Sequence, residues 1–389
     1  MVIAAEAFHE LSPAAKAQAF ETLKAHPDFA KWTNAYHPNP RFDLATYVFM
    51  RSSTWPDEIR KTDNEYDHPE WHFIDYPLRP PHFVFEPDAR PTNNVLFGIQ
   101  QSEQTLGDTN AMPQARAAAM SWLVHLIGDL HQPLHAESLF TETYTNGDRG
   151  GNDFFVKPAQ FGIRLHAFWD GLLGTSASLA TQWKYAATLE NEFPRSSLPE
   201  LTTDLTPQSW SLESRTLAIN QAYLQGDLKG GTDADAAPSL PDGYPKNAKA
   251  VAERQGALAG FRLADEIQKY LKFNGEVPLL PENTNALVET EIKKISALEA
   301  KKYYDETMIV TGKVVNVSRR PNITILDIDQ PYPNAPLTAV IFQENVGQFG
   351  DLQKFRNQAV EITGTITEYH NKPEIILEST NQLKAVEPK

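Results

Sequence analysis

The sequence predicts a mainly α-helical bundle over residues 1–275, followed by a small all-β barrel domain over residues 303–389. Apolar residues recur at helical spacing through most of the first part. Beyond Tyr304 they gather in short strand-like runs, such as MIVTGKVVNV and AVEITGTITEY, bounded by Gly, Pro or Asn. A length of 389 residues agrees with two domains.

Several stretches of the first part carry clear helix signals. Ser12 and Pro13 form an N-cap and first-position pair that opens a helix over residues 14–26. Residues 41–62 are typical of a helix broken near Pro56, and residues 246–271 of a long helix. Residues 63–91 are rich in Pro, His and aromatics, which favours a loop that lines a site.

The second part is expected to begin with a linker, because FNGEVPLLPENTN combines Gly, Pro and Asn. Residues 286–302 are expected to form one connecting helix, so residues 276–302 would join the two domains. Five short strands and a helix-like insert over residues 346–355 then indicate a small closed barrel of the OB type.

Composition narrows the function. A hydrophobic fraction of 41 % and a charged fraction of 22 % are those of a globular protein, and no run approaches the roughly 18 apolar residues of a membrane helix. The net charge of −15 argues against a broad basic surface for polyanions, so a phosphate substrate would need metal ions at the site. Because there is no cysteine, metal ligands must come from His, Asp and Glu.

The strongest chemical signal is WLVHLIGDLHQPLH, residues 122–135. His125 and Asp129 are four residues apart and therefore share a helix face, and His135 follows just after the expected helix stop. The spacing recurs at His166 and Asp170. One such pair is common without a metal, but two pairs and a flanking His indicate a metal cluster built between helices.

With Asp57 and His72, which flank the aromatic loop, the sequence offers more candidate metal ligands than one catalytic ion needs. At least two ions are therefore expected. Two ions clamp the attacking and leaving oxygens of a phosphoester displacement. His131 is off the ligand face and is interpreted as a structural hydrogen-bonding residue.

These residues closely resemble the zinc-dependent, single-strand-specific nucleases of the S1/P1 type. The resemblance covers roughly residues 1–272 and rests on WPDEIR, WHFID, HLIGDLHQPLH, DRGGN, LHAFWD and AGFRLA, in that order. It implies a helical bundle of the kind shared with zinc phospholipase C and a trinuclear zinc site. By position, one zinc would be held by Asp57, His72 and His125. A second would be held by His135, His166 and Asp170.

The resemblance also implies roles for other residues. Asp129 would tie the first zinc to the third and orient the attacking water, and Arg60 would stabilise the charge on the phosphate, although it also fits an exposed helix arginine. Phe73 would stack a base and Asp75 would bond its edge, which favours single strands. Asn152 would lie near the phosphate, although a turn-forming Asn needs no such role.

One departure concerns the third zinc. In the family, the N-terminal amine, the carbonyl of the first Trp and a His five residues later bind that ion, and Met1 aligns just after that His. His9 is too late to replace it. We expect a truncated start and an exported protein, secreted or periplasmic; the alternative is loss of the third zinc.

The C-terminal part resembles the OB-like modules appended to bacterial nucleases. Single-strand binding is a hypothesis for it, with eight basic and eleven acidic residues from Tyr303 to Lys389. The candidates are Tyr332, Phe342, Tyr369, Lys313, Arg319 and Arg320.

The expected function is therefore a zinc-dependent endonuclease that cleaves single-stranded DNA and RNA to 5′-phosphate products. Nucleic acid and nucleotides are the expected partners, with no membrane and no obligate protein partner. Two alternatives stay open. One is a phospholipase C-type phosphodiesterase, and the other is a zinc- or nucleic-acid-binding protein with impaired catalysis.

Overall fold

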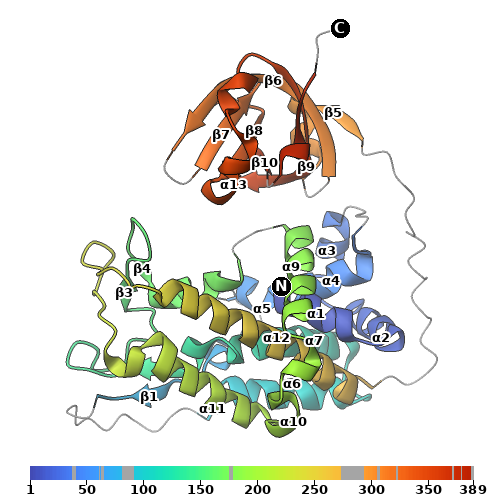
Figure 1. Ribbon diagram of the computed structural model, residues 1–389. Helices are drawn as coiled ribbons and strands as arrows, with labels where there is room; N and C mark the ends of the chain where they lie inside the picture. Colours follow the sequence, from blue (N-terminus) through green and yellow to red (C-terminus); the bar gives the residue numbers. More distant parts are fainter. Residues whose placement is uncertain are drawn as a thin grey trace. The chain divides into compact units, whose positions relative to one another are not determined.

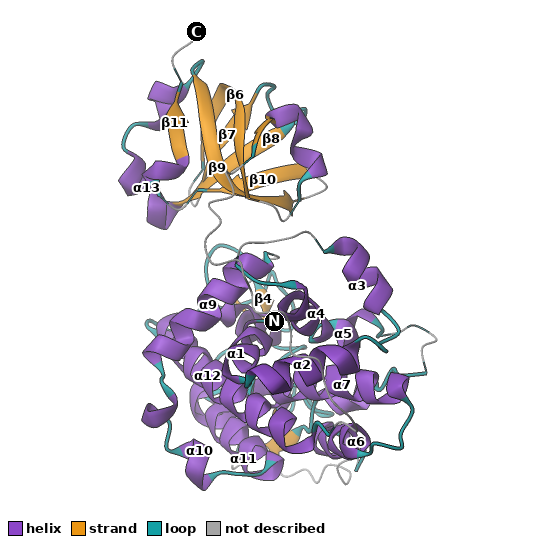
Figure 2. Ribbon diagram, turned by 90° about the vertical axis from the view of Figure 1, so that its right-hand side faces the viewer, coloured by secondary structure: helices purple, strands orange, loops and turns teal. Residues whose placement is uncertain are grey.

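The computed structural model describes residues 1–36, 41–60, 62, 65–80, 92–174, 178–272, 293–304, 307–320, 323–369, 372–377 and 379–386 (Figure 1). The chain divides into two compact units. The first comprises Met1–Tyr36 and Asp43–Glu282, and the second His37–Phe42 and Asn283–Lys389. The first unit is mainly helical and the second is mainly β, as Figure 2 shows by colour. The division into a helical first part and a β second part agrees with the prediction.

The first unit is built mainly from α-helices, some long and some of only one or two turns. They are α1 (Val2–Glu10), α2 (Pro13–Leu23), α3 (Phe29–Ala35), α4 (Leu44–Ser52), α5 (Trp55–Glu58), α6 (Val95–Gly107), α7 (Pro113–Leu130), α8 (Leu165–Asp170), α9 (Leu179–Glu192), α10 (Glu200–Thr203), α11 (Pro207–Leu217) and α12 (Tyr244–Tyr270). The predicted cap of α2 is confirmed, because the side chain of Ser12 accepts from the backbone N–H of Ala15 at 3.2 Å. None of the described helices is both long enough and apolar enough to cross a membrane.

Helix α7 forms the centre of this unit. Its sequence is apolar on nearly every side, so it is buried along most of its length, and Trp122 is only 2 % exposed. Gly98 lets α6 pack closely against Leu126 of α7 and against Trp71, since a Cβ at Gly98 would lie 2.8 Å from both side chains. A fully buried side chain such as that of Leu126 stabilises the fold by about 2 kcal/mol. The core therefore fixes α7 rigidly.

Short irregular segments meet at the C-terminal end of α7. The 3₁₀ helices η1 (Pro69–His72) and η2 (Pro133–His135) lead into β1 (Tyr76–Leu78) and β2 (Glu137–Leu139), which pair in parallel. The N–H of Ile74 donates to the carbonyl of His135 at 2.9 Å. A second pair, β3 (Phe155–Val156) and β4 (Ile163–Arg164), is antiparallel. The pairing of β1 with β2 brings together segments about 60 residues apart in the chain, since Tyr76 lies opposite Glu137.

The second unit contains the five predicted strands. They are β6 (Thr307–Arg319), β7 (Ile323–Ile328), β8 (Leu337–Phe342), β9 (Ala359–Tyr369) and β10 (Lys372–Ile376). The predicted helix-like insert corresponds to α13 (Gln343–Phe349) and η8 (Leu352–Phe355). Alternate residues of β7 and β8 point into a core that includes Leu326, Leu337 and Ala339.

The sheet itself differs from the expected small closed barrel. It is mixed and branched, with seven strands in the order β11-β9-β10-β8-β7-β6-β5 and a further pairing of β9 with β6. The long strands β6 and β9 each pair with three neighbours, because different parts of each strand face different partners. The register of β6 with β7 shifts between Val314 and Asn316. Strands β5 (Lys294–Ser296) and β11 (Leu383–Ala385) were not predicted.

The predicted connecting helix is wrong over residues 294–296, and only a short 3₁₀ helix follows them. Residues 294–296 form strand β5, parallel to β6, and Ala297–Lys302 form the 3₁₀ helix η7. Ser296 caps η7 together with Glu299, so the helical signal was local and short. The rest of the predicted linker, residues 276–292, lies outside the described residues.

Candidate metal centre

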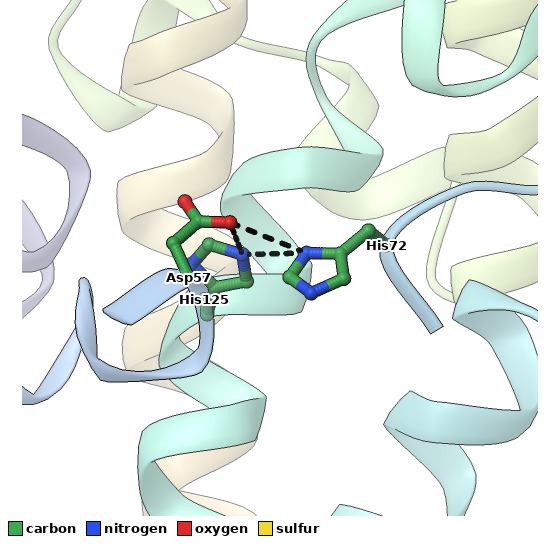
Figure 3. Close-up of side chains that lie close together, drawn as sticks. All are labelled: Asp57, His72 and His125. Carbon is green, nitrogen blue, oxygen red and sulfur yellow. Dashed lines mark hydrogen bonds and ion pairs between the residues drawn. The ribbon is translucent and has the colours of Figure 1, made fainter. Parts of the chain in front are cut away.

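Three side chains from separate elements form a first ligand group. Asp57 lies on α5, His72 ends η1 and His125 lies within α7. Nε2 of His125 is 2.9 Å from Nδ1 of His72, and Oδ1 of Asp57 is 3.9 Å from both nitrogens (Figure 3). These atoms therefore surround one point in space.

A second ligand group lies at the end of η2 and on α8. His166 and Asp170 are one turn apart on α8, and their Nε2 and Oδ2 atoms are 3.5 Å apart. Nε2 of His135 is 3.8 Å from Oδ1 of Asp170. One ligand atom from each of the three residues lies within 4.8 Å of the others. This group again combines two imidazoles and one carboxylate.

Asp129 links the two groups. Its Oδ2 atom is 3.0 Å from Nδ1 of His72, 3.0 Å from Nε2 of His125 and 3.7 Å from Nδ1 of His135. The helical spacing of His125 and Asp129 thus places both on one face of α7, as the sequence predicted. A single carboxylate oxygen contacts ligands of both groups.

Backbone carbonyls orient three of the four histidines. Nδ1 of His125 donates to the carbonyl of Ser53 at 2.8 Å, and Nδ1 of His135 to that of His72 at 2.6 Å. Nδ1 of His166 donates to the carbonyl of Gly150 at 2.8 Å. Each bond leaves the opposite nitrogen, Nε2, with its lone pair toward the ligand group. Metal-binding histidines are held in this way.

The DRGGN turn supplies one of these carbonyls. Gly150 has a φ of +60°, and a Cβ at this position would collide with the carbonyl oxygen of Leu134, so only glycine fits. The buried carboxylate of Asp148 anchors the turn by accepting from the N–H of Leu139 at 2.9 Å and from the hydroxyl of Tyr223 at 2.8 Å. The DRGGN motif therefore has a structural role, which is to position the carbonyl of Gly150, and its sequence alone did not indicate this role.

The electrostatics of the centre favour cations. Burial alone would raise the pKa of Asp129, but the neighbouring His125 and His135 hold it well below its ordinary value. Burial alone would lower the pKa of His135, but Asp129 and Asp170 raise it to about 10. Positive charge is therefore stabilised between these carboxylates, which is what a divalent ion requires.

The ligand spacing fits bound metal ions. Two ligands on one tetrahedral zinc lie about 3.3 Å apart, given bonds of about 2.0–2.1 Å. The measured separations of 2.9 and 3.9 Å in the first group, and 3.5 and 3.8 Å in the second, lie around this value. The donors are imidazole nitrogens and carboxylate oxygens, which suit zinc. The residues therefore fit one ion in each group.

Both groups open into one pocket of about 300 Å³. Its lining includes Asp57, His125, Asp129, His135 and Asp170. The carboxylates of Asp57 and Asp170 are about half exposed, whereas the histidines are largely buried. A water molecule and a phosphate-sized group thus have access to the side of the centre where the carboxylates lie.

Of the other predicted site residues, only Arg60 is in contact with a candidate ligand, and none of Arg60, Phe73, Asp75 and Asn152 lines the pocket. Arg60 is 42 % exposed, and its Nη1 atom is 3.7 Å from Oδ1 of Asp57, so it lies beside a ligand. Phe73, directly after His72, is 37 % exposed. Asn152 donates its side-chain N–H to the carbonyl of Arg149 at 3.0 Å, which is the turn-forming role considered for it.

Asp75 is held in an unusual conformation. Its φ of +49° lies in the left-handed region, which is uncommon for a residue other than glycine. Burial, reinforced by the negative charge of Asp148, raises the pKa of Asp75 to about 6. The neighbouring N–H of Tyr76 donates to the carbonyl of Ala136 at 2.8 Å, which ties this strand to the segment after His135.

Two residues inside the recognised motifs had no assigned role. Gln132, within HQPLH, donates from Nε2 to Oδ1 of Asp170 at 2.9 Å and so orients that ligand. Arg262, within AGFRLA, lies 2.8 Å from Nε2 of His131 and forms two hydrogen bonds to Glu213. Nδ1 of His131 donates to the carbonyl of Ile127 at 2.7 Å, so the interpretation of His131 as structural is confirmed.

A helical unit that holds two neighbouring groups of His and Asp ligands is typical of a metal-dependent enzyme. The model of the S1/P1 nuclease family matches residues 1–272, which is well over half of the chain. The chain therefore belongs to the S1/P1 nuclease family, and the class of enzyme is a nuclease.

Curated relatives agree with this membership. Endonuclease 3 of Arabidopsis thaliana is 28 % identical over 239 residues, which cover 56 % of this chain and 74 % of the relative. Nuclease S1 of Aspergillus oryzae is 27 % identical over 254 residues, covering 60 % and 83 %. Nuclease P1 of Penicillium citrinum is 26 % identical over 240 residues, covering 56 % and 82 %.

Proposed function

We propose that this protein is a zinc-dependent endonuclease that hydrolyses the phosphodiester bonds of single-stranded DNA and RNA to 5′-phosphate products. The observation that carries the proposal is the contact of Oδ2 of Asp129 with ligands of both groups, at 3.0 to 3.7 Å, inside one pocket. Two ligand groups so close together suit an in-line displacement at phosphorus, where both the attacking and the leaving oxygen need stabilisation.

One zinc ion would be held by Asp57, His72 and His125 in one group. A second zinc ion would be held by His135, His166 and Asp170 in the other group. Bound zinc supplies a lowered pKa for water and a counter-charge for the phosphate. Asp129, which is buried and keeps its negative charge, would accept a hydrogen bond from the attacking water and align it with the phosphorus.

Residues beside the centre would bind the substrate. Arg60, 3.7 Å from Asp57, would donate to a phosphate oxygen as charge develops there. The exposed ring of Phe73 would stack on a base, and Asp75 would accept from the edge of that base. A paired base offers neither face nor edge, so both contacts select single strands. Asn152 would remain near the phosphate through the turn that it stabilises.

The test is an assay of the purified full chain with four substrates. We expect acid-soluble nucleotides from single-stranded DNA and from RNA, at least tenfold more slowly from duplex DNA, and no product from phosphatidylcholine. Dialysis against a chelator should abolish hydrolysis, and added zinc should restore it. Hydrolysis of phosphatidylcholine alone would replace the proposal with a phospholipase, and binding of zinc and nucleic acid without any turnover would replace it with a binding protein.

The metal content and location are part of the same proposal. The two described ligand groups support two zinc ions per chain, which elemental analysis of the purified protein would measure. A count of three would indicate a further site outside these two groups. An exported location, secreted or periplasmic, follows the family and is tested by fractionating cells that express the natural gene.

A further inference from the structure

The C-terminal unit has its own pocket, formed on one face of the mixed sheet. Its volume is about 740 Å³, within the range of small-molecule and nucleotide sites. Strands β6, β7, β8 and β10 contribute to its wall, and Ile325 and Val340 are among the apolar residues that line it. Residues of the loop between β7 and β8 complete the wall. The pocket lies entirely within this unit.

Exposed aromatic side chains line this pocket. Tyr332 is 73 % exposed, Tyr369 is 60 % exposed and Phe342 is 37 % exposed. Within the described part of the C-terminal unit, the large apolar side chains that are exposed are these three and Leu298, which lies outside the pocket. Aromatic rings kept in solvent around one depression indicate a ligand with a flat face on which they stack.

Cations lie at the same pocket. The ammonium of Lys372 is 5.0 Å from the ring centroid of Tyr332 and donates to the carbonyl of Pro333, so it is held at the wall. Arg320 also lines the pocket and is exposed. Two cations beside aromatic rings suit a ligand that carries phosphate as well as a ring.

A buried carboxylate supplies a different kind of group. Asp327 is 1 % exposed and lines the pocket. Its Oδ2 atom accepts from the side chain of Asn316 at 2.9 Å and from the N–H of Tyr332 at 3.3 Å. Its Oδ1 atom has no hydrogen-bond partner among the described residues. An unpartnered buried acceptor is costly, so a ligand that brings an N–H donor would gain free energy here.

These groups together match a nucleotide. A nucleobase has a flat face for Tyr332 and Tyr369, and its amino group is a donor of the kind that a carboxylate recognises. The attached phosphates would meet Arg320 and Lys372. A glycan would also stack on tyrosine, but a neutral sugar carries no phosphate for Arg320 and Lys372, which line the pocket together with the carboxylates of Asp327 and Glu374.

We propose that this pocket is a second nucleic-acid site, which binds one base of a single strand between its tyrosines with the amino edge of the base toward Asp327. The inference rests on the proposed nuclease function and extends it, because a strand held here stays bound to the enzyme between cleavage events. Guanine, adenine and cytosine carry amino groups and thymine does not, so oligo-dT should bind more weakly than oligo-dC.

The test measures binding without cleavage. A fluorescent single-stranded phosphorothioate 12-mer, which resists hydrolysis, is titrated with the full chain and its anisotropy is followed. The double variant Tyr332→Ala, Tyr369→Ala should bind about tenfold more weakly, since each stacked base contributes substantially. Leu298→Ala, an exposed apolar residue outside the pocket, is the matched control and should bind as the wild type does.

Further variants separate the two kinds of contact. Lys372→Ala should weaken binding and make it less dependent on salt, whereas Lys384→Ala, an exposed lysine outside the pocket, should do neither. Asp327→Asn should reduce the difference between oligo-dC and oligo-dT. Equal dissociation constants for the double variant and the wild type would overturn the proposal, and so would preferential binding of a neutral oligosaccharide.

The outcome does not depend on catalysis. Hydrolysis of single-stranded DNA by the wild-type chain tests the proposed nuclease function, and the loss of phosphorothioate binding in the double variant tests this second site. Activity with unchanged binding would contradict only the second site. Weaker binding by the double variant, with no hydrolysis by the wild type, would contradict only the nuclease.

Discussion

The two ligand groups contain the same residue types but are held differently. His72 and His125 of the first group are 3 % and 8 % exposed at the side chain, and the hydrophobic core fixes their elements. His135 and His166 of the second group are 13 % and 17 % exposed, and the turn at Gly150 orients one of them. Core packing thus fixes the first group, whereas the second group combines a short helix with a turn that orients His166.

This difference has a physical consequence. A ligand fixed by the core is preorganised, so little conformational entropy is lost when the ion binds, but its removal leaves a cavity. A ligand fixed by a turn depends on the backbone conformation of that turn. We therefore expect changes at the first group to affect both metal and fold, and changes around the second group to affect mainly the metal.

The largest effect is expected from Asp129→Asn, because Asp129 contacts both groups. Under the proposed function, losing this charge would remove the acceptor for water and weaken the binding of both proposed ions, so hydrolysis of single-stranded DNA should fall about 1,000-fold or more. Elemental analysis should show less than two zinc ions per chain. Glu21→Gln, a surface carboxylate on α2, is the control. Retention of both ions and of full activity would show that the groups are independent.

Removing one histidine from each group tests the comparison directly. His125→Ala and His166→Ala should each lose one zinc ion and reduce hydrolysis about 100-fold. His125→Ala should in addition lower the free energy of unfolding by about 2 kcal/mol, because it leaves a cavity in α7, whereas His166→Ala should lower it by less than about 1 kcal/mol. Thermal unfolding of the metal-free proteins measures this. Equal destabilisation would remove the distinction between the groups.

Gly150→Ala should affect the second group alone. The added Cβ collides with the carbonyl oxygen of Leu134 and displaces the carbonyl that orients His166, so zinc affinity of that group should fall about 10- to 100-fold. Gly243→Ala is the matched control, since Gly243 also has a positive φ of 80° but a Cβ there meets nothing within 4 Å. Competitive titration with a chelator resolves the two ions. A loss at the first group would contradict the assignment.

The smallest effect on hydrolysis is expected from a buried carboxylate outside the two ligand groups. Glu6 is fully buried against Gly260, and burial, reinforced by Glu190 and Glu10, raises its pKa to about 9. The folded state therefore binds a proton that the unfolded state releases above pH 4.5, so stability falls as the pH rises toward 9. Glu6→Gln should be more stable than the wild type by about 4 kcal/mol at pH 8, since each pKa unit corresponds to about 1.4 kcal/mol, and about equal to it at pH 4. A difference that does not vary with pH would contradict this account.

The sequence predicted local features well. The five strands from β6 to β10 follow the alternating runs, and the four-residue spacings predicted the neighbouring side chains of His125 with Asp129 and of His166 with Asp170. Such signals depend on residues close in the chain. The connecting helix was wrong because residues 294–296 are a strand only through their pairing with β6.

Local sequence signals alone did not predict the contacts between segments that are distant in the chain. Nothing in DRGGN itself indicates that the carbonyl of Gly150 orients His166, or that Arg262 in AGFRLA bonds His131. The barrel was predicted as simple and closed because five strand signals suffice for one; that β6 and β9 each pair with three neighbours follows from their length and position in the folded sheet.

The sequence by itself determined the ligand types, their helical spacing and the family, because these depend on residue identity and short-range periodicity. Only the tertiary structure decided that Asp129 contacts both groups and that Tyr332, Tyr369 and Asp327 line one pocket. The physical reason is that packing of the core and pairing of strands bring together residues far apart in the chain, and no local pattern encodes those distances.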